Sequence, residues 1–462
     1  MAKLSLVFCV VLCLLNLVIE VTNGLAVPRS SGRTCIIGAG ISGLATAKYL
    51  QDYGVTNFTV FEATRHIGGT WRFDPHVGVD EDGLPLYTSQ YKYLRTNTPR
   101  ETMEFEEFPF PEGTPSYPSG TCYYKYLKLF TKNYDLYKYI QFRSHVRSVR
   151  WNKDRWSLSY HNTETQSDEV ASCDYVVLCS GHYSKPRWPK FEGAEAFKGS
   201  MIHSHDYKEP EPYRNRRVLL LGAGPSGLDL ATHLVNVTQK LVHSHHLVYN
   251  QPNFPKNYVK KPDIRAFTTD GVIFVDGSFE QVDDVIFCTG FDFDYPFLDE
   301  TSGVTVSGKF VLPVYQDIVN IRRPSMMFIG LTQVTITRVL LSQGEYAAAA
   351  IAGKFKLPPQ EQMLKHWLSK VYYLDSIGKK IVNVNLIGNL QDQYFGNLTS
   401  EAGVKRAPPV LTEIRDFNAQ IRLDDLLHYR DYDFNITDAF HYDRYYHPVD
   451  PNNVPCPIDI DF

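Results

Sequence analysis

The sequence has no run of more than two consecutive basic residues. Lys and Arg number 47 against 51 Asp and Glu, which gives a formal net charge of -4. Nucleic-acid surfaces are contacted by strongly basic patches, so we expect no nucleic-acid partner. The 462 residues are 43% hydrophobic and 21% charged, which is typical of a folded chain rather than a disordered one. This length has room for two or three domains.

Cys-x-x-Cys pairs and His-Glu-x-x-His stretches are also absent. The first absence disfavours a disulfide oxidoreductase, which needs two neighbouring redox cysteines. The second leads us to expect no metal, although His243 and His245 share one strand face. Six cysteines follow the N-terminal segment. Three fall in apolar, strand-like runs and are expected to be small core residues, namely Cys35, Cys179 and Cys288. The spacing leaves the disulfide pattern open, and a bond such as Cys122 to Cys456 is compatible with it.

Only one segment is apolar over a length close to a membrane span, from Leu4 to Val21. A lysine precedes it, and the small residues Thr22, Gly24 and Ala26 follow it. This pattern predicts a cleaved signal peptide over 1–24 and a secreted protein. The alternative is an uncleaved anchor, which Asn16 and Glu20 disfavour because polar groups are costly in lipid. After cleavage we expect no stable membrane insertion.

Four glycosylation sequons support an exported chain only weakly, since chance matches are common. The one at Asn57 precedes a strand and is the least favoured, whereas two others lie in turn-like surroundings; the four are Asn57, Asn236, Asn397 and Asn435. The acidic, aromatic stretch 431–450 is expected to pack onto the body of the protein. The sequence leaves a homo-oligomer open.

The first nucleotide-binding pattern begins at an apolar strand, Thr34 to Ile37. A Gly-x-Gly-x-x-Gly turn follows and leads into a helix from Leu44 to Tyr53; the turn is Gly38, Ala39, Gly40, Ile41, Ser42 and Gly43. These glycines allow a tight turn, close approach to a pyrophosphate and close helix packing. The next strand, Phe58 to Phe61, ends in Glu62, whose carboxylate can accept both hydroxyls of a ribose.

The pattern recurs after the strand Arg217 to Leu221, with Gly222 to Gly227 as the second turn. Here the following strand ends without an acid and offers His243, Ser244, His245 and His246 instead. An acid would repel a 2′-phosphate, whereas imidazole and hydroxyl groups can donate to one, so this site favours NADPH over NADH. The alternative is a solvated strand end without a ligand.

Between the two turns, Phe197 to Tyr207 reads Phe-x-Gly-x-x-x-His-x-x-x-Tyr. This resembles the identifying motif of the flavin-containing monooxygenases, whose Baeyer–Villiger relatives carry Trp at the position of Tyr207. Further family-like stretches run from about Arg33 to Leu298 in the family's order; they are Phe61-Glu62, 67–71, 94–101, 108–111 and 288–291.

The resemblance implies FAD and NADPH as cofactors, with a small-molecule amine and O2 as substrates. It implies FAD contacts from the first turn and Glu62, with Thr70 and Trp71 beside them and Asn97 and Thr98 near the isoalloxazine. It implies NADPH contacts from Ser226, Gly227, Leu228 and Asp229, with Thr96 and Asn97 at the nicotinamide end. The second turn and the strand end themselves add Gly222, Gly224, Ser244 and His245 as expected contacts.

In the family's catalysis NADPH reduces FAD, dioxygen adds at flavin C4a, and the hydroperoxide passes its distal oxygen to a soft nucleophile. We expect Asn97 to be the catalytic residue, because its amide can donate to the hydroperoxide and accept from the nicotinamide amide. An Asx turn before Thr98-Pro99 is the alternative role. The family commonly has Arg at the position of His245, so NADPH selectivity is expected to be weaker here or dependent on pH.

A short stretch at 251–263, no hydrophobic C-terminal anchor and the export signal together resemble the insect secreted pyrrolizidine-alkaloid N-oxygenases. That branch implies a bicyclic tertiary amine as substrate and an N-oxide as product. Three alternatives have the same motifs: a broad amine and thioether oxygenase, an NADPH oxidase that makes hydrogen peroxide, and a non-catalytic alkaloid-binding protein.

The expected fold class is α/β, with two Rossmann-like doubly wound domains and the NADPH domain inserted in the FAD domain. We expect the FAD domain over 33–195 and 285–462 and the NADPH domain over 196–284. The strand 285–287 would return to the FAD domain and meet the flavin. Helices are expected at 345–351 and 360–373, and 341–344 could line the cleft.

Overall fold

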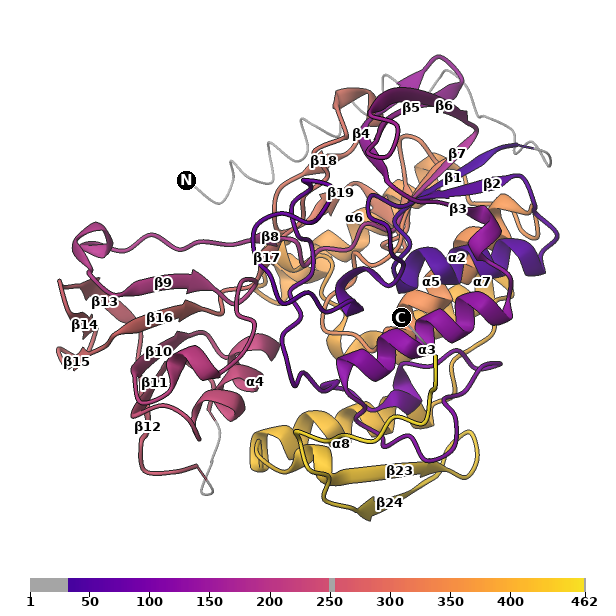
Figure 1. Cartoon of the computed structure of the whole chain (residues 1–462). Helices are drawn as coiled ribbons and strands as arrows, with labels where there is room; N and C mark the ends of the chain where they lie inside the picture. The colour runs from indigo at the N-terminus through magenta and orange to yellow at the C-terminus, as the bar shows by residue number, and fades with distance from the viewer. Residues whose placement is uncertain (1–31, 249–253, 461–462) are drawn as a thin grey trace.

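Two sheets, one mostly parallel and one wholly parallel, organise the protein, and each has its own glycine-rich turn (Figure 1). The structure is a computed structural model that describes residues 32–248 and 254–460. The predicted signal peptide at 1–24 lies outside these residues. The expected α/β class with two Rossmann-like sheets is confirmed.

The larger sheet has the strand order β20-β21-β22-β7-β1-β2-β3. Its strands β1, β2, β3, β7 and β22 run parallel, and Ile37 at the end of β1 pairs with Phe61 and with Leu178. Strands β1 and β2 begin and end where the sequence predicted. The bounds are β1 Thr34–Ile37, β2 Phe58–Phe61, β3 Ile140–Gln141, β7 Tyr175–Leu178, β20 Val314–Tyr315, β21 Val319–Asn320 and β22 Met326–Phe328.

The smaller sheet has the order β12-β11-β10-β16-β9 and is wholly parallel. Its strands are β9 Ser200–His203, β10 Arg217–Leu221, β11 Lys240–Ser244, β12 Tyr258–Lys261 and β16 Asp284–Phe287. The return of 285–287 to the first domain was predicted wrongly. These residues are in β16, which pairs with β10, so the expected boundary after residue 284 cuts through a strand of the second sheet.

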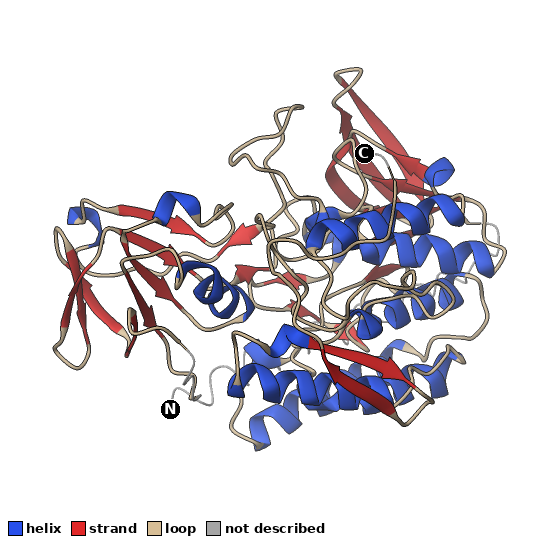
Figure 2. Cartoon of the chain, turned by 60° about the horizontal axis from the view of Figure 1, so that its bottom comes forward, coloured by secondary structure: helices blue, strands red, loops and turns tan. Residues whose placement is uncertain are grey.

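Helices gather on the larger lobe, whereas the smaller lobe is mostly strands (Figure 2). Helix α2 packs against α5, where a Cβ on Gly344 would lie 3.2 Å from Thr46. Gln343 is buried and joins Gly330 to Tyr394, so 341–344 forms part of this helix packing and does not line a cleft as expected. The helices are α2 Ile41–Asp52, α3 Gly120–Asn133, α4 Pro225–Leu234, α5 Thr337–Ile351, α6 Gln360–Ser376, α7 Gln391–Ala402 and α8 Val410–Asp424.

Small antiparallel units complete the chain. The C-terminal stretch 431–450 forms the hairpin β23–β24 and packs onto the body as expected, with Phe434 buried and its amide donating to Ser116. The strands of these units are β4 Ser144–Asn152, β5 Arg155–Asn162, β6 Ser167–Cys173, β8 Lys185–Pro186, β13 Ile264–Phe267, β14 Gly271–Phe274, β15 Phe279–Gln281, β17 Phe291–Asp292, β18 Thr305–Val306, β19 Val311–Leu312, β23 Tyr432–Ile436 and β24 Tyr442–Tyr446.

Two disulfides cross the larger lobe. One joins Cys122 of α3 to Cys456 near the C-terminus, as the sequence allowed, across a separation of 334 residues. The other joins Cys35 of β1 to Cys173 of β6. Cys35 was predicted to be an unbonded core residue; it is buried, but its partner arrives from a strand 138 residues away. Cys179 and Cys288 are free and buried, as predicted.

Replacing Cys456 with serine is expected to lower the free energy of unfolding by about 2–4 kcal/mol, because the unbridged chain gains more conformational entropy on unfolding than the bridged chain does. Urea denaturation with and without a reductant measures this. Reductant should destabilise the unaltered protein more than the variant, since only the former still holds this bond. An unchanged urea midpoint in the variant would contradict the expectation.

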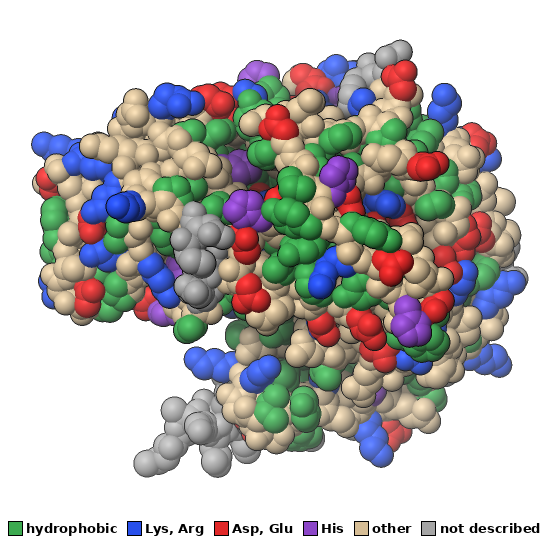
Figure 3. Space-filling view, turned by 90° about the horizontal axis from the view of Figure 1, so that it is seen from below, with side chains coloured by type: hydrophobic (Ala, Val, Ile, Leu, Met, Phe, Trp, Pro, Cys, Tyr) green, Lys and Arg blue, Asp and Glu red, His purple; other side chains and the backbone are tan. Residues whose placement is uncertain are grey.

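The face seen from below has no patch of one charge sign, because acidic, basic and hydrophobic side chains are interspersed there (Figure 3).

Among the sequons, Asn57, Asn236 and Asn435 are exposed. Asn397 lies within α7 rather than in a turn. Within 32–248 and 254–460, no helix is long and apolar enough to cross a membrane.

Candidate active site

The first glycine-rich turn joins β1 to α2. Gly38 has a φ of +101°, and a Cβ there would lie 2.6 Å from the carbonyl oxygen of Cys179. A Cβ on Gly43 would overlap the carbonyl oxygen of Gly38. No side chain caps α2 and its first turn has no acidic residue. The amides at the start of α2 are therefore open to an anion, and the bare turn fits a pyrophosphate.

The second turn repeats this geometry between β10 and α4. Gly222 has a φ of +104°, and a Cβ there would lie 2.6 Å from the carbonyl oxygen of Cys288. A Cβ on Gly227 would overlap the carbonyl oxygen of Gly222. Helix α4 has Gly224 as its N-cap, Pro225 in its first turn, and neither a capping side chain nor an acid there. Two anion cradles of the same construction are therefore present.

The two free cysteines occupy equivalent places behind these turns. Cys179 follows β7 and Cys288 follows β16, and burial raises the pKa of each thiol to about 12. Thiols with such a pKa stay protonated and unreactive at neutral pH. The sequence analysis missed this placement, although the repeated Cys-Ser-Gly and Cys-Thr-Gly at 179–181 and 288–290 could have indicated it.

Glu62 lies at the first turn, directly after β2. One carboxylate oxygen accepts from the amide of Ala39 at 2.8 Å, and the other accepts from the amide and hydroxyl of Thr64 at 2.9 Å. Burial raises the pKa of Glu62. The amide of Gly68 donates to Ala39 at 2.9 Å, which folds the short helix Gly69–Trp71 onto the same turn. Thr70 and Trp71 thus lie beside it.

Thr96, Asn97 and Thr98 lie in a stretch without regular structure that ends at Pro99. The Asn97 carbonyl accepts from Asn418 at 3.0 Å. In an Asx turn the Asn97 side chain would accept from the amide two residues on, but Pro99 has no N–H, so that alternative fails. The hydroxyl of Thr96 is buried and has no hydrogen-bond partner in the described part of the chain. A buried hydroxyl without a partner is costly, and a ligand that pairs with it removes this cost, so Thr96 fits a ligand-binding site.

The predicted contact of Asp229 with NADPH needs correction. Its carboxylate is buried, accepts a short hydrogen bond from the hydroxyl of Tyr91, and forms an ion pair with Arg430 at 2.5 Å. The arginine holds the pKa of Asp229 below its usual range despite burial. The side chain is therefore held by Tyr91 and Arg430 within the protein. Ser226 and Leu228 lie in the first turn of α4, as expected.

The end of β11 differs from the expected cluster of phosphate donors. The ring of His243 lies between the Gly222 carbonyl at 2.9 Å and the Tyr258 hydroxyl at 3.1 Å, and Ser244 donates to the Pro262 carbonyl at 2.7 Å. Of the predicted contacts, the Ser244 hydroxyl is thus already bonded to the backbone of Pro262. His245 packs edge-on against His243. Strand β12 pairs here and brings Lys260 and Lys261 opposite 243 and 244, two cations that the sequence analysis missed.

The imidazoles of His243 and His245 are expected to give no pH-dependent cofactor preference. Burial lowers the pKa of His243 to about 4 and that of His245 to about 3, so neither changes its charge between pH 6 and pH 8. The ratio of kcat/KM for NADPH to that for NADH should therefore follow the same pH profile in His245→Asn as in the unaltered protein. Comparing the two profiles cancels the titration of the 2′-phosphate itself. As a positive control, His245→Arg should raise the ratio by about tenfold through a charged hydrogen bond. Profiles that diverge below pH 7 would contradict the expectation.

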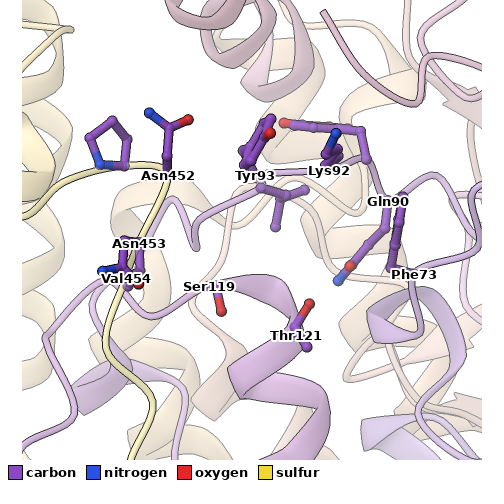
Figure 4. Close-up of a pocket in the computed structure, with 12 residues that line it drawn as sticks. Phe73, Gln90, Lys92, Tyr93, Ser119, Thr121, Asn452, Asn453 and Val454 are labelled. Carbon is purple, nitrogen blue, oxygen red and sulfur yellow. The ribbon is translucent and has the colours of Figure 1, made fainter.

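A cavity of about 340 Å³ opens beside the Asn97 stretch, between 90–94, the start of α3 and the C-terminal tail (Figure 4). Gln90 and Thr121 point into it, and Asn452 and Asn453 border it from the tail. The Cys122–Cys456 disulfide holds that tail against α3. Sequence reasoning missed this cavity, because no local pattern indicates that the tail returns across more than 300 residues.

Each of the two glycine-rich turns fits a dinucleotide, and the described residues contain no redox cysteine pair. This combination is typical of an oxidoreductase that binds two dinucleotide cofactors. A family profile described as flavin-binding monooxygenase-like matches residues 31–247 and 256–412. The chain is 46% identical over 452 residues to senecionine N-oxygenase of Tyria jacobaeae, covering 96% of this chain and 98% of that protein.

More distant relatives agree. Trimethylamine monooxygenase of Roseovarius nubinhibens is 30% identical over 71% of this chain and 76% of that protein. The structure of S-allyl-L-cysteine S-oxygenase from Allium sativum superposes with a TM-score of 0.80 at 26% identity, over 87% of this chain and 95% of that one. The chain therefore belongs to the flavin-binding monooxygenase-like family. It is a monooxygenase that uses FAD and NADPH.

Proposed function

We propose that the protein N-oxygenates a tertiary amine, and that this amine is a pyrrolizidine alkaloid. The observation that carries the proposal is the 46% identity to senecionine N-oxygenase over nearly the whole of both chains. The reaction joins the amine, NADPH, a proton and O2 to give the N-oxide, NADP+ and water. One oxygen atom goes to the nitrogen lone pair, and the other leaves as water with the two electrons of NADPH.

The first turn would hold FAD and the second NADPH. Backbone amides at the start of α2, in the stretch 38–43, would face the FAD pyrophosphate, with Glu62 accepting from its ribose. Thr70, Trp71 and Thr98 would border the flavin. Gly222, Gly224, Ser226, Gly227 and Leu228 would form the NADPH cradle, with His245 at its strand end. Bound FAD, reduced by NADPH, supplies the activation of dioxygen.

Asn97 would act between the two cofactors. Its carboxamide can donate through N–H and accept through its oxygen at the same time, so it can orient the reacting oxygen and the nicotinamide amide. It has no proton to give up, which suits a residue that orients rather than titrates. The unpartnered hydroxyl of Thr96 lies next to it.

We place the nucleotide units at 33–186 with 292–460 for FAD, and at 187–291 for NADPH.

The two disulfides are consistent with an exported protein, because such bonds persist in oxidising compartments. The predicted signal peptide at 1–24 would provide the route.

Mass spectrometry of products tests the function. Protein loaded with FAD is incubated with NADPH, oxygen and a panel of a pyrrolizidine alkaloid, simple tertiary amines and thioethers. We expect a mass gain of one oxygen on the alkaloid and the highest kcat/KM for it. Equal turnover of amines and thioethers would favour the broad oxygenase, which the similarity to an S-oxygenase structure also supports. NADPH consumption with hydrogen peroxide alone would indicate an oxidase, and a yellow protein that NADPH does not bleach would indicate a binder.

A further inference from the structure

A short C-terminal segment reaches between the two nucleotide units. After α8 the chain forms a single helical turn, Tyr429–Asp431, and Arg430 from this turn is only 9% exposed. Helix α8 and the hairpin β23–β24 lie along one edge of the larger lobe, next to the side where the smaller lobe projects (Figure 1). Arg430 thus stands where the two lobes meet.

The guanidinium of Arg430 has partners on both sides of this junction. Towards the smaller lobe it forms the ion pair with Asp229 of α4. Towards the larger lobe its Nε donates to the carbonyl of Thr96 at 2.9 Å and its Nη2 donates to the carbonyl of Arg95 at 3.3 Å. One buried side chain therefore touches the helix of the second turn and the residues just before Asn97.

Two further contacts hold the same stretch. The buried Arg95 returns the contact by donating from its Nη2 to the carbonyl of Arg430 at 3.0 Å. Asn418 of α8 donates to the carbonyl of Asn97 at 3.0 Å and accepts from the hydroxyl of Tyr117 at 2.7 Å. The carbonyls of 95, 96 and 97 are thus all bonded by the C-terminal segment, although this stretch lacks a helix or strand of its own.

Buried charges of this kind are costly, and apolar residues would fill the same space with equal or better stability. An ion pair instead fixes geometry, because a planar guanidinium donates well only to partners within a narrow range of positions. A device that fixes geometry is useful where a displacement of about 1 Å between reacting groups costs up to about 100-fold in rate.

We propose that Arg430 is a positioning residue that sets the placement of Asn97 relative to α4, and so relative to the nicotinamide. Asn418 completes the device by holding the carbonyl of Asn97 itself. This inference rests on the proposed role of Asn97 between the two cofactors.

The test compares Arg430→Lys with Arg338→Lys in the FAD-loaded protein. Arg338 is the matched control, because it is equally buried and pairs with Glu106 inside the larger lobe. Hydrogen exchange of amides 96–98, the dissociation constant for NADP+ and the share of NADPH that ends as hydrogen peroxide are measured in each. In Arg430→Lys we expect faster exchange of these amides, weaker NADP+ binding, and a larger peroxide share with product formation slowed by up to about 100-fold. Arg338→Lys should change none of the three.

Asn418→Ala gives a second, uncharged probe that leaves the buried ion pair intact. It should raise the peroxide share but weaken NADP+ binding less than Arg430→Lys does, because it releases only the Asn97 side of the device and leaves α4 in place. The proposal is overturned if Arg430→Lys matches Arg338→Lys in NADP+ affinity and in peroxide share. If Asn97→Ala stays fully coupled while Arg430→Lys loses NADP+ affinity, the role of Asn97 fails but the link between Arg430 and α4 stands.

Discussion

Replacing Asn97 with alanine is expected to leave a yellow protein that still takes electrons from NADPH but releases hydrogen peroxide in place of oxygenated product. FAD should remain bound, because the contacts proposed to hold it lie in the first turn and at Glu62. The amide lost is the donor proposed to orient the reacting oxygen, and removing a donor of this kind costs about 100- to 1000-fold in rate. Product formation should fall by that factor, whereas NADPH oxidation should continue.

Parallel assays of NADPH, peroxide and product measure this coupling. Asn97→Asp is the matched variant, because it keeps the size and the acceptor but loses the N–H donor. If donation is what matters, both variants should be uncoupled. Full coupling of NADPH use to product in Asn97→Ala would remove Asn97 from the mechanism.

Gly43→Ala and Gly227→Ala should separate the two nucleotide sites. In each, the new Cβ would overlap the carbonyl oxygen of the first glycine of its turn, which is backbone and cannot swing aside. Overpacking of this kind costs about 1–3 kcal/mol, which corresponds to about 5- to 150-fold weaker binding. Gly43→Ala should therefore be purified with little FAD. Gly227→Ala should stay yellow but need far more NADPH to be bleached.

FAD absorbance and NADPH titration distinguish the two outcomes. Gly396→Ala is the control, because this glycine lies within α7 and its nearest neighbour to a new Cβ is the end of the Arg406 side chain at 3.9 Å. It should behave like the unaltered protein. Loss of FAD from Gly227→Ala with FAD retained in Gly43→Ala would reverse the assignment of the two turns.

Local patterns predicted the nucleotide units well. Strands β1, β2 and β10 begin and end as expected, and both glycine turns lie between a strand and a helix. Such motifs succeed because strand, turn and helix are set by neighbours along the chain. The error at 285–287 has the opposite cause. Cys-Ser-Gly and Cys-Thr-Gly follow buried strands in both units, so the pattern alone could not indicate which sheet each strand joins.

Features that join distant segments were the ones missed. The bond of Cys35 to Cys173, the approach of Lys260 and Lys261 to β11, and the arrival of Arg430 at Asp229 all depend on tertiary structure. Asp229 illustrates the limit. The family resemblance implied a contact of Asp229 with NADPH, but its carboxylate pairs with a buried arginine that lies 201 residues further along the chain.

The ribbon formed by β8 and β17 carries both covalent connections between the lobes (Figure 1). The chain enters the smaller lobe through Lys185–Pro186 and leaves it through Phe291–Asp292, and Arg187 clasps the ribbon by donating to Asp292 at 2.6 Å. Two adjacent strands that connect two lobes can act as a hinge about which the lobes rotate. The Arg430–Asp229 ion pair is a further, non-covalent connection between the lobes, beside the contacts of Tyr91 with Asp229 and of Lys92 with Glu209. A rotation of the smaller lobe about the ribbon would have to separate this buried pair of charges, and it would disturb the Asn97 stretch at the same time.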